Sequence, residues 1–230
     1  MKLVFYWKDF LSLFFPECCF GCGVGLLYQE KFLCTTCLYH LPLTYFHLDS
    51  NNEPTRQLRG KCDFQNATAM LFLSEGSRVE RILYQLKYNG HPEIGYFLGI
   101  KYGEVLRRTR EYADVDLVVP VPLHRKRQRK RGYNQAEYFA QGLATSMSIP
   151  LDNVNLVRTI ETSSQTMYSR LDRYDNVEGI FDILNKEALT DKHILLVDDV
   201  LTTGATLASA ASMLSGISGV RVSIATLARA

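Results

Sequence analysis

The chain has 230 residues, and its contents of 47% hydrophobic and 22% charged residues are typical of a soluble globular protein. This length allows one domain, or a main domain with a small appendage. The formal net charge of +2 is too small to indicate a partner, and no stretch reaches the roughly 18 apolar residues that a membrane-spanning helix needs.

Residues 1–15, MKLVFYWKDFLSLFF, are rich in aromatic and aliphatic side chains. We do not expect them to be a signal peptide, because Lys8 and Asp9 interrupt the apolar run and Pro16-Glu17-Cys18 offers no small-residue cleavage site. We expect an amphipathic helix that docks against the body of the protein, and contact with a membrane surface or a partner is the alternative. The expected location is cytoplasmic, with peripheral attachment to the inner face of the membrane as the variant that such a helix would permit.

Four of the six cysteines form two Cys-x2-Cys pairs that are separated by 11 residues. This spacing is typical of a tetrahedral zinc site with four thiolates, which is structural because it leaves no open coordination position. Disulfides are the alternative, and a cytoplasmic compartment disfavours them. The expected ligands are Cys19, Cys22, Cys34 and Cys37; Cys18 could replace Cys19, His40 or His47 could intrude, and Cys62 is expected to be a packed thiol.

Residues 48–62 are polar and without periodicity, which predicts a linker. From residue 67 the pattern becomes regular. We expect a strand at 69–73, a helix from the Ser77–Glu80 capping box to Asn89-Gly90, a second helix at 93–109 and a strand at 116–119. Strands that alternate with helices predict a largely parallel sheet covered by helices on both faces.

The segment that follows the strand at 116–119 is strongly basic. Residues 124–131 are expected to form a loop ahead of a helix that Asn134 and Glu137 cap. A solvated surface is one interpretation of this loop, and contact with a nucleic-acid backbone, which predicts a steep salt dependence, is another. The six cations of the loop are Arg125, Lys126, Arg127, Arg129, Lys130 and Arg131.

The stretch ILLVDDVLTTGAT at 194–206 has the most informative chemistry. Four apolar residues predict a buried strand, which is followed by Asp198 and Asp199, a small-residue loop and a helix. Backbone N–H groups and the positive helix end favour an anion at such a loop, and the hydroxyls of its threonines could add donors. The carboxylates repel a phosphate but suit a sugar diol or a magnesium ion, so the pattern indicates a ribose 5-phosphate. A buried strand with an incidental acidic turn is the alternative.

Residues 194–206 resemble the phosphoribosyl-pyrophosphate (PRPP) motif of type I phosphoribosyltransferases. The resemblance implies that Asp198 and Asp199 are catalytic and face the ribose hydroxyls. It also implies that the basic loop, through Leu123, His124, Arg125, Lys126 and Arg131, binds the pyrophosphate half of PRPP together with Mg²⁺. The expected ligands of the 5-phosphate are Thr202, Thr203, Gly204, Ala205 and Thr206.

Residues 119–140, VPVPLHRKRQRKRGYNQAEYFA, resemble the signature of the ComF competence family, also labelled GntX-like. Members of that family join an N-terminal four-cysteine zinc element to a phosphoribosyltransferase domain. The implied fold class is therefore α/β and type I phosphoribosyltransferase-like, with an N-terminal helix and zinc element over 1–60 and the main domain over 61–230.

Strands are expected at 154–160, 181–184 and 220–227, and the polar segment at 161–177 has no pattern. Its position resembles the flexible loop that closes over the substrate in this superfamily, although an ordinary exposed loop is the alternative. The residues that match polar positions of the ComF pattern are Gln165, Arg170, Arg173 and Asn176. The binding crevice is expected at the carboxyl ends of the strands, where 120–131 and 198–206 would meet.

The ComF resemblance implies a role in natural transformation and DNA uptake, with competence-machinery proteins as potential partners. Magnesium-dependent phosphoribosyl transfer is the first hypothesis, although no residue stands out as a general base. The chain ends at Ala230, where purine-using relatives continue into a base-binding hood, so the zinc element and residues 38–66 are expected to cover the site. A non-catalytic PRPP-binding protein that handles single-stranded DNA through the basic loop, Tyr133, Tyr168 and Tyr174 is the alternative.

Overall fold

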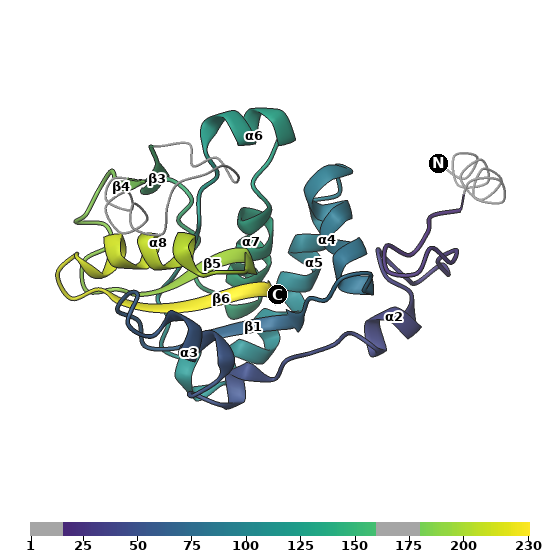
Figure 1. Ribbon diagram of the computed structural model, residues 1–230, viewed down its shortest axis with the longest axis horizontal. Helices are drawn as coiled ribbons and strands as arrows, with labels where there is room; N and C mark the ends of the chain where they lie inside the picture. The colour runs from purple at the N-terminus through teal and green to yellow at the C-terminus, as the bar shows by residue number, and fades with distance from the viewer. Residues whose placement is uncertain (1–15, 160–179) are drawn as a thin grey trace.

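The computed structural model describes residues 16–159 and 180–230 (Figure 1). The helix expected at 1–15, the two tyrosines Tyr168 and Tyr174, and the flexible-loop residues Gln165, Arg170, Arg173 and Asn176 lie outside the described residues. Within the described part, no helix is both long enough and apolar enough to cross a membrane.

A four-stranded parallel sheet forms the centre of the molecule, with the strand order β1-β6-β5-β2. Its strands are β1 (Ala67–Phe72), β2 (Leu117–Pro120), β5 (His193–Leu201) and β6 (Arg221–Arg229). The short strands β3 (Leu156–Arg158) and β4 (Phe181–Ile183) pair with each other in an antiparallel hairpin. This arrangement confirms the expected parallel sheet, although the strands predicted near 154–160 and 181–184 form a separate hairpin.

Helices and the hairpin cover the two faces of the sheet. The helices are α2 (Thr35–Tyr39), α3 (Glu53–Leu58), α4 (Arg78–Tyr88), α5 (Glu93–Leu106), α6 (Arg125–Arg131), α7 (Gln135–Met147) and α8 (Ala205–Ser215), with 3-10 turns η1 (Phe46–Leu48) and η2 (Arg110–Tyr112). One buried cluster joins α4, α5 and α7 to one face, and a second joins α3, α8 and the hairpin to the other. Successive residues of β5 alternate between the clusters, since Ile194 and Leu196 belong to the second and Leu195 and Val197 to the first.

The strand predicted to end at Val197 continues to Leu201, which corrects the expected position of the acids. Asp198 and Asp199 lie within β5, and Asp198 pairs with Thr226 of β6. The neighbouring strand β6 is equally long, so the ladder of backbone hydrogen bonds continues past the last apolar residue of β5.

The basic segment expected to be a loop is a helix. His124 caps α6, with its Nδ1 atom accepting from the Lys126 N–H at 3.3 Å, and Gly132 ends it in the left-handed conformation, with φ = 84°. Arg, Lys and Gln are strong helix formers, and glycine tolerates the positive φ that commonly follows a helix. The prediction of a loop missed both signals.

The segment 48–62, predicted to be a linker, contains α3. Asn52 caps this helix by accepting from the Thr55 N–H at 2.9 Å, and Pro54 lies in its first turn. Both residues favour a helix start. The helix is too short to repeat an apolar period, which is why the pattern concealed it, yet Leu58 is fully buried.

Ser77 and Asn134 cap α4 and α7 as predicted, but the carboxylate of Glu80 does not bond back to the cap residue. The Ser77 hydroxyl accepts from the Glu80 N–H at 3.1 Å, while the Glu80 carboxylate accepts from the Gly76 N–H at 2.6 Å. Asn134 caps α7 by accepting from the Ala136 N–H, and its amide donates to the Val121 carbonyl at 3.0 Å. The start of α7 is thereby fixed to the chain that leaves β2.

Candidate functional site

The site lies at the edge of the sheet where β2 and β5 end side by side. Pro120 is the register partner of Val197, and the Val121 N–H donates to the Val197 carbonyl at 2.7 Å. The segment after β2 therefore starts beside Asp198. Because the carboxyl ends of parallel strands share one edge, the two segments that carry the predicted residues are neighbours there.

The two acids of β5 face opposite sides of the sheet. Asp199 Oδ2 lies 3.0 Å from Lys87 Nζ, which comes from the last turn of α4, and both side chains are partly buried. Asp198 lies on the side of the hairpin, where the charge of Arg158 acts on it. The alternation of side chains along a strand places a different cation beside each acid.

Burial and, to a smaller extent, the neighbouring charge of Asp199 raise the pKa of Asp198 to about 7. The Asp199 N–H, which donates to Asp198 Oδ1 at 2.8 Å, and the charges of Lys87 and Arg158 act in the opposite direction. Asp198 is therefore balanced between its neutral and ionised forms near neutral pH. A diol or a metal ion would favour the ionised form.

The small-residue loop after β5 leads directly into α8. Gly204 precedes the helix with φ = 79°, a conformation that favours glycine, and the first intrahelical bond runs from the Ala208 N–H to the Gly204 carbonyl at 2.8 Å. The N–H groups of residues 205–207 therefore have no intrahelical acceptor. The Ala205 N–H makes a contact of 3.5 Å with the Thr203 hydroxyl.

The segment that contains α3 holds the back of this loop. Gln57 Nε2 donates to the Thr202 carbonyl, and Lys61 Nζ donates to the Thr203 carbonyl at 2.9 Å. In a trans peptide the C=O and N–H groups point in opposite directions, so the N–H groups of Thr203 and Gly204 face away from α3. Together with the start of α8, they form a set of donors on the open side of the loop.

Leu58 closes the same contact with its side chain. A Cβ atom on Gly204 would lie 2.7 Å from Leu58 Cδ2, so the loop and α3 approach each other as closely as a glycine allows. The requirement for glycine at position 204 is therefore twofold, through its φ angle and through this packing.

A cavity of about 400 Å³ opens between the chain after β2 and the β3–β4 hairpin, and its lining includes Arg158, whose charge acts on Asp198. This volume lies within the range of small-molecule sites. The guanidinium of Arg158 lies 5.4 Å from the centroid of the Phe181 ring. Burial and the charge of Arg127 lower the pKa of Arg158, while the charge of Asp198 raises it. The lining residues are Pro122, Leu123, His124, Gln128, Asn153, Leu156, Val157, Arg158, Thr159 and Leu184.

The predicted pyrophosphate residues divide between the cavity and the outside of α6. Leu123 and His124 line the cavity, whereas Lys126 is exposed. Arg131 donates to Gln135 Oε1 at 2.9 Å, and its guanidinium lies 5.3 Å from the centroid of the Tyr88 ring. Arg131 is therefore engaged at the junction of α4, α6 and α7.

Sequence reasoning missed Lys87, which pairs with Asp199, and Arg158, whose charge acts on Asp198. Lys87 adjoins the apolar stripe of α4, and Arg158 lies in a three-residue strand, so neither stands in a motif. Only the packing of α4 and of the hairpin against opposite faces of β5 brings them to the site. Of the expected cover, Gln57 and Lys61 of the segment 38–66 contact the phosphate loop. The cysteine element instead packs beside α5, through Phe20 with His91, which lies just before that helix, and through Phe32 with Phe97.

The sulfur atoms of Cys19, Cys22, Cys34 and Cys37 all lie within 4.8 Å of one another. Cys18, His40 and His47 do not belong to this group. The Cys34 N–H donates to Cys19 Sγ at 3.2 Å, and Gly23 makes the turn after the first pair with φ = 80°. Sulfur–sulfur separations of about 3.8 Å follow from tetrahedral metal–sulfur bonds of about 2.3 Å. The group therefore fits a tetrahedral metal ion.

The surroundings of the four cysteines shift the pKa values of their thiols in different directions. Burial raises the pKa of Cys19, but the backbone N–H groups of Cys34, Cys22 and Gly21 outweigh it and lower the pKa to about 7. Burial and the neighbouring sulfurs raise the pKa of Cys37 instead. Cys19 is therefore partly ionised near neutral pH, and binding of a metal ion would release the remaining thiol protons.

Residues 134–230 match the family model of the phosphoribosyl transferase domain. The chain is 30% identical to the DNA utilization protein YhgH of Escherichia coli K12 over 198 residues, 84% of this chain and 83% of that protein. It is 34% identical to competence protein F of Haemophilus influenzae over 125 residues, 54% of this chain and 55% of that one. Competence protein ComFC of Bacillus subtilis is 32% identical over 137 residues, 59% of this chain and 53% of its own. The two competence proteins are thus matched over little more than half their length.

Proposed function

Because this chain belongs to the ComF-like family of proteins with a type I phosphoribosyltransferase domain, we propose that it binds PRPP at the carboxyl edge of its sheet and acts in DNA uptake or use. The observation that carries the proposal is the order of groups along β5 and α8. Two carboxylates are followed, after a short threonine-containing stretch, by a glycine-led helix start, and the amide donors of this loop face away from α3. A ribose 5-phosphate requires acceptors for its hydroxyls next to donors for its phosphate, and this stretch supplies both.

Each part of PRPP has a counterpart in the site. The backbone of Thr202–Thr206 would hold the 5-phosphate, and Asp198 and Asp199 would accept hydrogen bonds from the ribose hydroxyls. His124 and the cavity beside it would hold the pyrophosphate. Further contacts from Arg125, Lys126, Arg131 and the loop residues Gln165, Arg170, Arg173 and Asn176 remain predictions from the sequence.

In phosphoribosyl transfer, the bond between the anomeric carbon and pyrophosphate breaks as a bond to an acceptor forms, and positive charge develops on the ribose. The carboxylates of Asp198 and Asp199 would stabilise that charge, and Lys87 and Arg158 would offset their mutual repulsion. Mg²⁺, when bound with PRPP, would neutralise the leaving group. We assign no described side chain as a general base for the acceptor.

The four-cysteine group would hold a structural Zn²⁺, because four thiolates leave no position for a substrate. We propose the division into an N-terminal element over 1–60 and a main domain over 61–230. In this division α3 belongs to the N-terminal part while it supports the phosphate loop.

Titration calorimetry with PRPP and Mg²⁺ tests the binding proposal. The wild-type chain should bind PRPP, and Asp199→Asn should weaken binding by at least about tenfold. The asparagine side chain lacks the negative charge and has only one oxygen that can accept hydrogen bonds from the ribose hydroxyls. Arg59→Ala, on the exposed outer side of α3, is the matched control and should bind normally. Equal affinity of Asp199→Asn and the wild type would refute the ribose assignment.

A non-catalytic PRPP-binding protein is the second candidate, favoured by the lack of an assigned base and by relatives whose names refer to DNA use and competence. Release of pyrophosphate, measured with PRPP and a panel of nucleobases, separates the two. Release above the rate of an Asp198→Asn/Asp199→Asn variant supports transfer. No release across the panel, with PRPP binding intact, supports the non-catalytic candidate.

A further inference from the structure

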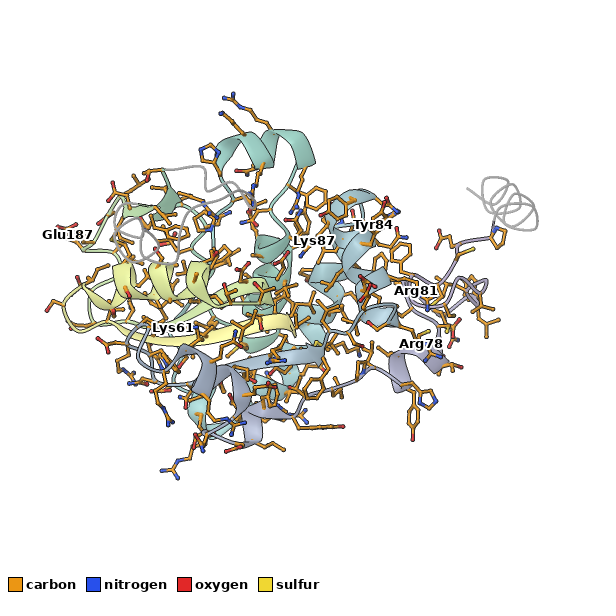
Figure 2. All side chains as sticks on the ribbon, viewed as in Figure 1. Lys61, Arg78, Arg81, Tyr84, Lys87 and Glu187 are labelled. Atoms are coloured by element: carbon orange, nitrogen blue, oxygen red, sulfur yellow. The ribbon has the colours of Figure 1, made fainter. Side chains whose placement is uncertain are left out.

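Helix α4 has a side that neither the core nor the acid site uses. Its buried residues, Val79, Ile82, Leu83 and Leu86, face the sheet, and Lys87 reaches Asp199. Figure 2 shows Arg78, Arg81 and Tyr84 one after another along the outer side of the helix, with Lys87 nearer the sheet.

Two tyrosines on this outer side are exposed and lie against each other. Tyr84 is 55% exposed and Tyr88 is 61% exposed, and their ring centroids are 5.2 Å apart with the planes tilted by 46°. Residues four positions apart are neighbours on a helix surface, so the pair is fixed by the helix itself. Exposed aromatic rings of this kind offer flat apolar faces to a partner without the entropic cost of ordering a loop.

Cations lie at both ends of the tyrosine pair. Arg78 and Arg81 are exposed on the same helix, and the guanidinium of Arg131, at the end of α6, lies 5.3 Å from the centroid of the Tyr88 ring. The acid of this region on α4 is Glu80, whose carboxylate accepts a hydrogen bond from the Gly76 N–H. We call Arg78, Arg81, Tyr84, Tyr88 and Arg131 the α4–α6 surface.

The sequence placed nucleic-acid stacking on Tyr133, but the structure does not favour that residue. The Tyr133 hydroxyl donates to the Leu86 carbonyl at 2.7 Å, and its ring meets Tyr138 edge-on at 5.8 Å. Tyr133 therefore joins α7 to the end of α4. Among the residues that the structure describes, Tyr84 and Tyr88 are exposed rings on the helix that contacts the end of α6.

We propose that the α4–α6 surface binds single-stranded DNA, with bases stacked on Tyr84 and Tyr88 and phosphates paired with the flanking arginines. Cations next to exposed rings are what a single strand needs, since its bases are free to stack. Duplex DNA could use the arginines but not the rings. An acidic peptide would likewise leave the rings without a matching group. The proposal deepens the role in DNA use given above and rests on it.

The rings are tested by fluorescence anisotropy with a labelled oligo(dT) and the full chain. Tyr84→Ala/Tyr88→Ala should weaken binding by at least about tenfold, from the stacking of two bases, whereas Tyr84→Phe/Tyr88→Phe keeps the rings and should bind within about twofold. Tyr39→Ala is the matched control, because Tyr39 is 84% exposed on the cysteine element, and it should bind as the wild type does. Equal affinity of the double alanine variant and the wild type would overturn the proposal.

The arginines are tested by salt dependence. Arg78→Gln/Arg81→Gln should lower the slope of log affinity against log salt concentration by about 1.4, at about 0.7 for each lost phosphate contact on a single strand. The double alanine variant should keep the wild-type slope, because it loses no cation. An unchanged slope in the arginine variant would place the phosphates elsewhere and overturn the proposal.

Two competitors decide the class of partner. Unlabelled single strands should displace the probe at lower concentration than duplex of the same length or polyglutamate. Displacement by polyglutamate that also depends on Tyr84 and Tyr88 would overturn the proposal in favour of an acidic protein. PRPP calorimetry on the same variants keeps the tests separate: loss of DNA binding with normal PRPP binding supports the surface, and a chain that binds DNA but no PRPP refutes only the PRPP site.

Discussion

The two neighbouring acids of β5 differ because a strand points successive side chains to opposite faces. Asp199 meets a lysine of α4, while Asp198 has its pKa raised to about 7 by burial and by the charge of Asp199. Asp198 is therefore partly protonated near neutral pH. Any ligand that needs the Asp198 carboxylate ionised must remove its proton when it binds near or below neutral pH.

We predict that PRPP affinity falls as the pH drops below about 7. Asp198 is increasingly neutral there, and a neutral carboxyl is a poorer acceptor for a hydroxyl and a poorer ligand for Mg²⁺. The affinity for PRPP, measured by calorimetry over a pH series, should fall about tenfold for each pH unit below the pKa of Asp198. The phosphates of PRPP also titrate, near pH 6. Asp198→Asn therefore serves as the reference, and the difference between the two profiles isolates the carboxyl.

Lys87→Met should move the midpoint of that difference to higher pH, because the lysine charge lowers the pKa of Asp198.

The pH should affect the stability of the fold in the opposite sense from PRPP affinity. The folded pKa lies above the unfolded value, so the native state holds more protons between about pH 4 and 7, and the contribution of Asp198 to stability declines as the pH rises. A pH profile of affinity that is identical in the wild type and Asp198→Asn would contradict this account.

Helix α3 and the turn that follows it act on the phosphate loop through one side chain each, Gln57 and Lys61. By holding the carbonyls of Thr202 and Thr203, Gln57 and Lys61 set the direction of the opposite N–H groups. We predict that Gln57→Ala and Lys61→Ala each weaken PRPP binding by roughly fivefold, the value of one hydrogen bond of about 1 kcal/mol.

The unfolding free energy should be almost unchanged in Lys61→Ala, because that side chain is exposed. Arg59→Ala, which removes a contact with Asn51 instead, is the control for both measurements and should leave affinity unaltered. Normal PRPP affinity in both the Gln57 and Lys61 variants would show that the loop holds its shape without α3.

Elements with a long apolar period were predictable, and short polar helices were not. Four buried positions recur along α4, so its extent follows from the sequence to within a residue. Helix α3 buries one leucine and α6 has no apolar residue, so neither shows a period. The capping residues Asn52 and His124 marked the starts of these helices in the sequence, but a capping residue is informative only where a helix is already expected.

At the scale of the whole molecule, the sequence predicted the groups on β5 and α8 but not what surrounds them. The acids and the loop are local in the chain, and their chemistry follows from residue type and order. The side chains around them come from α4 (Lys87), α3 (Gln57), the turn after α3 (Lys61) and β3 (Arg158), through contacts that depend on which faces of the sheet these segments cover. Such contacts have no local signature.

The cysteine element shares the core of the main domain. Cys19, Cys34 and Cys37 belong to the same buried cluster as α4, α5 and α7, and Phe20 lies 4.7 Å from the His91 ring just after α4. A metal ion at the four sulfurs would therefore stabilise more than its own loops, because a continuous core unfolds cooperatively. The surface that α4 presents to DNA would depend on the same ion.

We accordingly predict one unfolding transition in which zinc release and loss of secondary structure coincide. Far-UV circular dichroism and a chromophoric zinc chelator would follow the two events during the same temperature ramp. Cys34→Ser should lower both midpoints together, on the order of 5–10 °C for a loss of a few kcal/mol in a chain of this size. Cys18→Ser, outside the group of four, should lower neither. Zinc that leaves well below an unchanged main transition would mean that the element folds as a separate unit, and the shared buried cluster would then contribute little to cooperativity.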